Sequence, residues 1–233
     1  IPYDDIQYNP ILKKSEPVMN RCQGSLFMLT QDEYDELMRL IREKNPEPNI
    51  DEEEPTVDHE PYWDEDFLKD VYMKENDYER LKELLLRKKN LILQGAPGVG
   101  KTFAAKRLAY AIMGEKDEDR IKVVQFHQNY SYEDFVLGYK PNENGGFELK
   151  EGVFYQFCKK ASTDKDNEYF FIIDEINRGN LSKIFGELLM MIEKEYRNTP
   201  MQMSYADRRF VVPSNVYLIG MMNTADRSLA MID

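Results

Sequence analysis

Eight consecutive residues, 95–102, have the types and the spacing of a phosphate-binding loop. They read Gly-Ala-Pro-Gly-Val-Gly-Lys-Thr and match the pattern G-x-x-x-x-G-K-[ST]. The glycines let backbone N–H groups curl around phosphates, the lysine adds a mobile positive charge, and the threonine hydroxyl can bind Mg²⁺. We therefore predict a nucleoside triphosphate site formed by Gly95, Ala96, Pro97, Gly98, Val99, Gly100, Lys101, Thr102 and Phe103.

The residues on either side of this loop have the pattern that the chemistry requires. The apolar run at 91–93, Leu-Ile-Leu, is typical of a buried strand, and residues 102–113 are typical of a helix. The N-terminus of such a helix directs the positive end of its dipole at the phosphates. A chance glycine-rich turn is the alternative, but strand, loop, Lys-Thr pair and helix in this order favour the phosphate site.

Two adjacent carboxylates, Asp174 and Glu175, follow a second buried-strand pattern, Tyr-Phe-Phe-Ile-Ile at 169–173. At the carboxyl end of a parallel strand, both side chains reach the crevice where ligands bind. Asp174 is placed to hold Mg²⁺ directly or through water, and Glu175 to polarise an attacking water. Acids are common at strand ends. The signal gains weight because it follows the loop by about seventy residues, with room for another strand between them.

Asn223 follows a further apolar run at 216–222. If this strand is adjacent to that of the phosphate-binding loop, the amide lies beside the terminal phosphate, where it can bind a phosphate oxygen or the attacking water. The alternative is that Asn223 and Thr224 cap the next helix. Spacing alone leaves the two interpretations open.

Strands and helices alternate along the part of the chain that carries these side chains. We expect strands at 91–94, 122–126, 169–173 and 216–221, with helices at 67–73, 78–86 (behind an Asp77 N-cap), 102–113, 132–137, 153–161 and 181–193. Residues 147–149 suggest a hairpin, and 201–203 can pair with 210–212. This order predicts an α/β fold with a parallel sheet flanked by helices.

The N-terminal third has a different character. Residues 24–29 could form a strand, and a capping-box pattern at 30–33 with apolar residues at 34, 37, 38 and 41 predicts a helix at 31–42. Such a short α+β fragment buries no core, so 1–42 is expected to be the C-terminal remnant of a preceding domain. Residues 43–66, acidic and proline-containing, predict a solvated linker rather than a docking tail. The NTPase core is expected at 67–233.

Composition and charge exclude several classes of function. Hydrophobic residues make up 42% of the 233, which is ordinary for a soluble globular protein, and no apolar run is long enough to cross a membrane. With no secretory signal, the cytoplasm is the default location. Two cysteines are too few for a disulfide framework or metal site.

The net charge of −12 is concentrated in one segment. Residues 41–66 carry eleven acids and two bases, whereas 89–233 carry twenty acids and nineteen bases. Strong direct binding of nucleic acid is therefore not expected, although an assembled ring could present a local basic surface.

Four motifs together resemble the McrB family, the AAA+ motor subunits of modification-dependent restriction systems. They are the loop at 95–102, Val-Gln-Phe-His-Gln-Asn-Tyr-Ser-Tyr-Glu-Asp-Phe at 124–135, Ile-Asp-Glu-Ile-Asn-Arg at 173–178 and Met-Asn-Thr-Ala-Asp-Arg-Ser at 222–228. The last motif is the most specific, and the likeness covers about 67–233. It implies an AAA+ P-loop NTPase core.

The resemblance implies further properties that spacing does not show. McrB-like proteins form hexameric rings, bind nucleotide between neighbouring subunits and hydrolyse GTP. A separate nuclease subunit, McrC, stimulates hydrolysis and cuts DNA, while a variable N-terminal domain recognises the modified target. By position, Asn223 would be the sensor. Asn177, Arg227 and Asp233 would belong to the polar network around the catalytic water and the partner's stimulating arginine.

Two departures from the family pattern affect these expectations. The chain ends at Asp233, before the expected arginine-rich segment and the helical lid, so we expect this chain alone to hydrolyse poorly. The N-K-x-D motif that reads guanine in Ras-like GTPases is absent, so GTP and ATP both stay open.

Two other functions remain as alternatives. A MoxR- or dynein-like AAA+ ATPase that remodels proteins would share the loop, the carboxylates and Asn223, but has no reason to carry the whole 223–228 run. A nucleotide-binding module without hydrolysis is disfavoured by Glu175.

Overall fold

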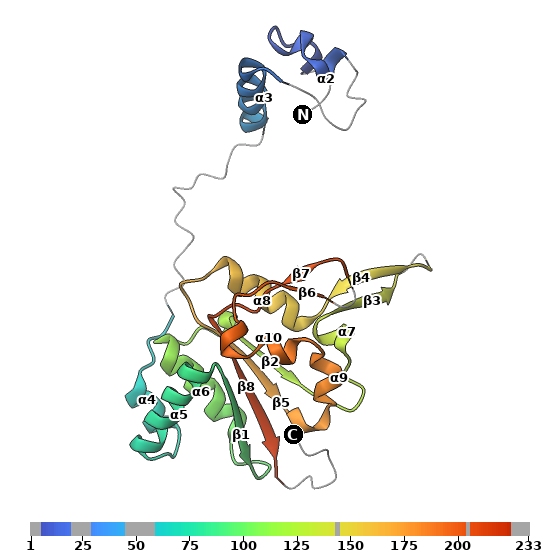
Figure 1. Cartoon of the computed structure of the whole chain (residues 1–233). Coiled ribbons are helices and arrows are strands. Elements are labelled where there is room, and N and C mark those ends of the chain that lie inside the picture. Colours follow the sequence, from blue (N-terminus) through green and yellow to red (C-terminus); the bar gives the residue numbers. More distant parts are fainter. Residues whose placement is uncertain (1–5, 20–28, 45–58, 143–144, 204–205, 225–233) are drawn as a thin grey trace. The chain divides into compact units, whose positions relative to one another are not determined.

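The computed structural model describes residues 6–19, 29–44, 59–142, 145–203 and 206–224. Contacts between residues divide the chain into two compact units, Ile1–Asp58 and His59–Asp233 (Figure 1). Cys22, Arg227, Asp233, most of the suggested strand at 24–29 and most of the predicted linker lie outside the described residues.

The described part of the first unit is helical. It contains η1 (Leu12–Lys14), α2 (Glu16–Met19) and α3 (Gln31–Lys44), and α3 confirms the helix predicted at 31–42. The predicted capping box is present: the Thr30 amide donates to Glu33 Oε2 at 2.8 Å, and the Glu33 amide donates to Thr30 Oγ1 at 3.4 Å. These bonds use N–H groups that a helix start leaves without partners.

The second unit is built on a parallel sheet whose strand order is β1-β8-β5-β2. The strands are β1 (Asn90–Gly95), β2 (Ile121–Gln125), β5 (Tyr169–Asp174) and β8 (Val216–Asn223). All three neighbouring pairs are parallel, which confirms the predicted α/β fold. The strand that comes last in the chain, β8, lies between β1 and β5.

Both faces of the sheet are covered, because side chains alternate along each strand. Phe170 and Ile172 of β5 pack with residues of α4 (Asp64–Asp70), α5 (Glu75–Lys88) and α6 (Lys101–Met113). Phe171 and Ile173 pack on the other face with α7 (Tyr132–Phe135), α8 (Val153–Thr163), α9 (Leu181–Phe185) and α10 (Leu188–Met191). All four side chains are at most 1% exposed, and each such burial stabilises the fold by about 1.5–3 kcal/mol.

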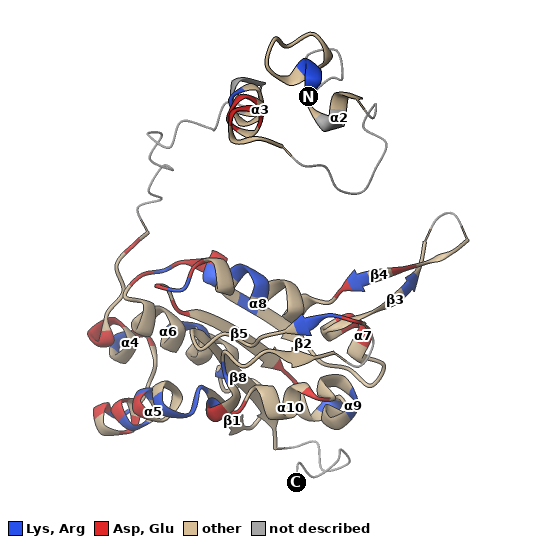
Figure 2. Ribbon diagram, turned by 45° about the horizontal axis from the view of Figure 1, so that its top comes forward, with Lys and Arg blue, Asp and Glu red and all other residues tan. Residues whose placement is uncertain are grey.

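The remaining elements are short. They are η2 (Glu118–Arg120), η3 (Ile176–Arg178), η4 (Lys194–Tyr196), β3 (Leu137–Pro141), β4 (Phe147–Glu151), β6 (Met201–Gln202) and β7 (Arg209–Phe210). Strands β3 and β4 form an antiparallel hairpin, as do β6 and β7, so both predicted pairings are confirmed. Charged residues of both signs are intermixed on α4 and α5 (Figure 2).

Several predicted helix boundaries are wrong. Helix α4 begins before Phe67, and the second compact unit begins at His59. Helix α5 begins at Glu75 with Lys74 as its N-cap, so Asp77 lies in the first turn. In the first turn, the negative charge of Asp77 still interacts favourably with the positive end of the helix dipole. The predicted helix at 132–137 ends at Phe135, and the chain then enters β3.

The helix predicted at 181–193 is interrupted at Gly186. This residue has φ 52° and ψ −127°, a conformation that side chains other than glycine rarely adopt. A Cβ atom there would lie 3.2 Å from the ring of Tyr132. The periodic pattern continues through the glycine, but the chain leaves the helical conformation there and passes close to Tyr132 of α7.

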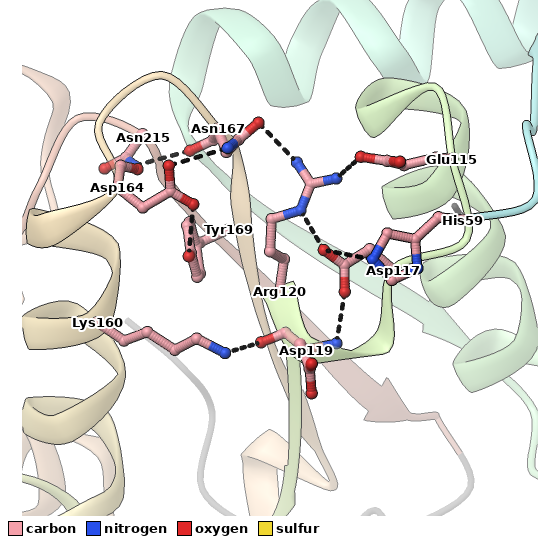
Figure 3. Close-up of polar contacts among 10 residues, drawn as sticks. All are labelled: His59, Glu115, Asp117, Asp119, Arg120, Lys160, Asp164, Asn167, Tyr169 and Asn215. Atoms are coloured by element: carbon pink, nitrogen blue, oxygen red, sulfur yellow. Dashed lines mark hydrogen bonds and ion pairs between the residues drawn. The ribbon is translucent and has the colours of Figure 1, made fainter. Parts of the chain in front are cut away.

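A polar network centred on the buried Arg120 and Asp117 joins the ends of the strands that are farthest from the phosphate-binding loop (Figure 3). Arg120, which precedes β2 and is 5% exposed, donates from Nε to Asp117 Oδ2 at 2.6 Å and from its guanidinium to Glu115 and Asn167. His59 lies 3.7 Å from the same Asp117 oxygen. The network thus ties the start of the second unit to the starts of β2 and β5.

We expect Asp117→Asn to weaken the fold and to flatten its dependence on acid. Burial acts to raise the pKa of Asp117, but the bonds from Arg120 and the Asp119 amide outweigh it and hold the pKa below the usual 3.8. A lowered folded-state pKa stabilises the protein above the unfolded-state pKa, and this stability is lost as the pH falls through the folded-state pKa. The variant should lose about 3 kcal/mol of unfolding free energy at pH 7.

Urea unfolding of the two proteins at a series of pH values between about 3 and 7 measures both effects. Glu148→Gln, which changes a surface ion pair with Lys150, serves as the control and should unfold like the unmodified protein. Equal acid sensitivity in Asp117→Asn and the unmodified protein would show that Asp117 does not contribute to the pH dependence of stability.

Candidate nucleotide-binding site

The sheet order brings the predicted site residues to one edge. Parallel pairing places Gly95, the last residue of β1, opposite Asn223, the last residue of β8. The Thr224 amide then donates to the Gly95 carbonyl at 3.2 Å. On the other side of β8, strand β5 ends at Asp174. The condition on which the sensor hypothesis for Asn223 depended, adjacency to the strand of the loop, is therefore met.

The loop between β1 and α6 has the backbone that its glycines predict. Gly98 and Gly100 have φ of 77° and 80°, in the left-handed region that favours glycine. A Cβ atom at either position would contact nothing within 4 Å, so backbone conformation and not space requires these two glycines. Helix α6 begins at Lys101, and the N–H groups of its first turn are available to an anion.

The Lys101 ammonium group is held over the loop by three oxygens. Its Nζ donates to the carbonyls of Gly95 at 3.1 Å and Ala96 at 2.8 Å, and to Asn223 Oδ1 at 2.6 Å. All three acceptors are uncharged. A phosphate, with full negative charge, forms stronger bonds with an ammonium group than uncharged oxygens do, so Lys101 is placed to exchange them for a nucleotide.

Asn223 connects Lys101 to Glu175. While its Oδ1 accepts from Lys101, its Nδ2 donates to Glu175 Oε1 at 2.5 Å. An amide can do both at once because it carries an acceptor and two donors. The Asn223 side chain thus connects the phosphate loop to Glu175, the carboxylate that was predicted to polarise the attacking water.

Thr102 and Asp174 have the donor atoms of a magnesium site. Thr102 Oγ1 donates to Asp174 Oδ2 at 3.5 Å, and Asp174 Oδ1 accepts from the Glu175 amide at 2.8 Å. Within the described ranges, no group of three or more His, Cys, Asp and Glu side chains gathers around a metal position. Mg²⁺ beside nucleotides commonly takes one or two protein oxygens together with phosphates and waters, and the hydroxyl and carboxylate fit that requirement.

Glu175 occupies an unusual backbone conformation at the end of β5. Its φ of 52° and ψ of 42° are left-handed, which costs a residue other than glycine about 1–3 kcal/mol. Its side chain is only 12% exposed, and Oε2 lies 3.2 Å from Arg178 Nε. That oxygen accepts no hydrogen bond from any residue that the structure describes.

The other predicted site residues do not belong to the chain of contacts from Lys101 to Glu175. Asn177 lies in η3, is 6% exposed, and its Oδ1 has no hydrogen-bond partner among the described residues. Phe103 is 47% exposed, and the Arg107 guanidinium lies over its ring at 4.5 Å. Arg227 and Asp233 lie outside the described residues. Arg178 is a site residue that was not predicted from the sequence, although its position three residues after Glu175 within the 173–178 motif was the available signal.

The fold and this edge of the sheet agree with a known family. The family described as AAA domain (dynein-related subfamily) matches residues 90–233, more than half of the chain. The chain therefore belongs to the AAA family, and its second unit is a P-loop nucleoside triphosphatase domain.

Within the AAA family, the chain is similar to two components of restriction enzymes. The chain is 53% identical, over 184 residues, to the type IV methyl-directed restriction enzyme EcoKMcrB subunit of Escherichia coli (strain K12), covering 77% of this chain and 40% of the relative. It is 27% identical, over 207 residues, to the type II restriction enzyme BsuMI component YdiS of Bacillus subtilis (strain 168), covering 72% and 60%. The predicted McrB resemblance is confirmed, while the chain spans less than two thirds of either relative.

A solved structure of a Cytophaga hutchinsonii protein is a more distant match. It superposes with a TM-score of 0.44 at 16% identity, covering 72% of this chain and 46% of that one. No helix in the described part of the chain is both long enough and apolar enough to cross a bilayer.

We expect Lys101→Ala to lose triphosphate affinity about ten- to a hundredfold, because it removes charge-assisted bonds to the phosphates. Titration of a fluorescent triphosphate analogue into the full-length protein measures this change. Lys106→Ala, on the same helix and paired with Glu118 at the surface, is the matched control and should bind normally. Full affinity in Lys101→Ala would refute the phosphate-loop assignment.

Proposed function

We propose that this chain is the nucleoside triphosphatase module of a ring-forming motor subunit that acts with a nuclease subunit in the restriction of modified DNA. The observation that carries the hydrolytic part is the continuous contact from Lys101 through Asn223 to Glu175. It joins a phosphate-binding group directly to a buried carboxylate next to the metal-ligand pair Thr102 and Asp174. The restriction part is supported by the printed names of the two relatives.

In the proposed reaction, the loop amides and Lys101 bind the phosphates and orient the terminal one. Thr102 and Asp174 hold Mg²⁺, which supplies positive charge to the phosphate oxygens when it is bound. Glu175 accepts a proton from the attacking water, and Asn223 holds that carboxylate at a defined place beside Lys101. Burial of Glu175 favours this role because fewer waters compete for its oxygens.

The proposed nucleotide, oligomeric state and partner follow from the McrB resemblance. We propose GTP as the preferred nucleotide, a hexameric ring with nucleotide between neighbouring subunits, and stimulation by an McrC-like nuclease subunit. DNA would be contacted by another domain or by the assembled complex, since acids and bases are nearly equal in number over 89–233. Asn177, Arg227 and Asp233 are proposed for the polar network around the catalytic water.

A protein-remodelling ATPase is the second candidate. Its support is the matched family itself, which is the dynein-related subfamily of AAA domains. Such a protein would use the same loop, carboxylates and asparagine. The restriction assignment is favoured because both curated relatives are named as components of restriction enzymes.

Comparison of GTP and ATP hydrolysis by the full-length protein, with and without its candidate nuclease subunit, separates these functions. We expect a higher kcat/KM for GTP, and a turnover that rises roughly tenfold or more when a stimulating arginine is supplied in trans. Preference for ATP with no stimulation would support the remodelling ATPase instead.

Glu175→Gln tests the catalytic carboxylate. The variant should bind nucleotide as the unmodified protein does but turn over at least roughly a hundredfold more slowly, because an amide cannot accept the proton. Single-turnover and steady-state assays separate binding from chemistry. Glu148→Gln on the β3–β4 hairpin, 49% exposed, is the matched control. Normal turnover in Glu175→Gln would remove Glu175 from the mechanism.

A further inference from the structure

Arg178 contacts the carboxylate on which the proposed hydrolysis depends. Its Nε lies 3.2 Å from Glu175 Oε2, and it ends the turn η3 that follows β5. The turn has its own backbone hydrogen bonds, and the Arg178 side chain adds a positive charge beside the Glu175 carboxylate.

Local bonds hold this turn in place at both ends. The Glu175 amide donates to Asp174 Oδ1 at 2.8 Å, and the Arg178 amide donates to the Glu175 carbonyl at 2.8 Å. At Gly179 a Cβ atom would lie 2.5 Å from Ile184 Cδ1, so the chain passes close to α9. The backbone that carries Glu175 and Arg178 is thus constrained before any ligand binds.

The two oxygens of Glu175 are in different situations. Oε1 is bound by Asn223 Nδ2 at 2.5 Å. Oε2 is buried and close to the Arg178 charge, yet it accepts no hydrogen bond from the residues that the structure describes. A carboxylate oxygen can accept two bonds, and a buried oxygen that accepts none calls for a functional explanation.

We propose that Arg178 is a positioning residue for Glu175, and that Oε2 is the oxygen that accepts the proton of the attacking water. Asn223 holds one oxygen and Arg178 attracts the other, so that the carboxylate cannot rotate about its last bond. The O–H bond of water breaks as its proton passes to Oε2, and the water oxygen forms its bond to the terminal phosphorus. The bond from that phosphorus to the bridging oxygen breaks at the same time, and the nucleoside diphosphate leaves with the electron pair. This inference rests on the proposed hydrolytic function and names the group that orients its base.

The Arg178 side chain is 44% exposed and that of Glu175 is 12% exposed, so the effect of Arg178 on folding has to be separated from its effect on the carboxylate. The chain offers a matched comparison in Arg208, which is 49% exposed and lies 3.3 Å from Glu151. If an exposed arginine beside a carboxylate were only a surface ion pair, the two substitutions to alanine would have the same consequences.

The test measures kcat and KM for nucleotide hydrolysis by the full-length protein. Arg178→Ala should lower kcat roughly tenfold or more and leave KM within about twofold, because it affects the base and not the phosphate contacts. Arg178→Lys, which keeps the charge without the planar fork, should recover part of kcat. Arg208→Ala should change neither constant. Melting temperatures of all variants identify any that fail to fold.

A double-mutant cycle with Glu175→Gln shows whether Arg178 acts through Glu175. The double variant should be no slower than Glu175→Gln alone, since residues that act as one unit are not additive. Additive losses, an unchanged or higher kcat in Arg178→Ala, or a defect confined to KM would each overturn the positioning role. The proposed function fails by a separate result, in which the unmodified full-length protein hydrolyses no triphosphate or Glu175→Gln turns over normally.

Discussion

The parallel pairing of β8 between β1 and β5 is the constraint on which the rest of this structure depends. Because the three strands run in the same direction, their carboxyl ends meet at one edge, and the polar residues that follow each strand become neighbours. Gly95 and Asn223 are opposite each other in this pairing. Outside this place between β1 and β5, Asn223 would be separated from Lys101 or from Glu175, and the contact from the phosphate loop to Glu175 would not exist.

The two ends of the parallel strands have different roles, one in stability and the other in function. At the strand starts, Arg120 and Asp117 are buried and paired with each other. At the strand ends, Glu175 has a left-handed backbone, and oxygens of Glu175 and Asn177 are buried without described hydrogen-bond partners. Strain and unused hydrogen-bonding capacity are costs that proteins keep at sites of function. The apolar layers on both faces supply the stability that offsets them.

The class of this protein follows from the loop, the sheet order and the family match, whereas its particular partners do not. A phosphate-binding loop with two carboxylates serves many AAA proteins, because the chemistry of phosphoryl transfer is the same in each. What distinguishes one member from another is the surface that a ring and its partners share. The chain spans 40% of its Escherichia coli relative, and the proposed ring, nuclease subunit and DNA contacts also depend on parts of the assembly other than this domain.

The sequence by itself determined the phosphate-binding loop, the paired carboxylates and the alternation of strands and helices, because these depend on local residue types and periodicity. It left the helix at 181–193 unbroken, because the apolar periodicity continues through Gly186, whose backbone leaves the helical conformation beside Tyr132. It could not decide whether Asn223 caps a helix or faces the loop, because strand order is a tertiary property. It also assigned no role to Arg178. Only the folded chain brings that side chain to Glu175 and leaves one buried carboxylate oxygen without a hydrogen-bond partner among the described residues.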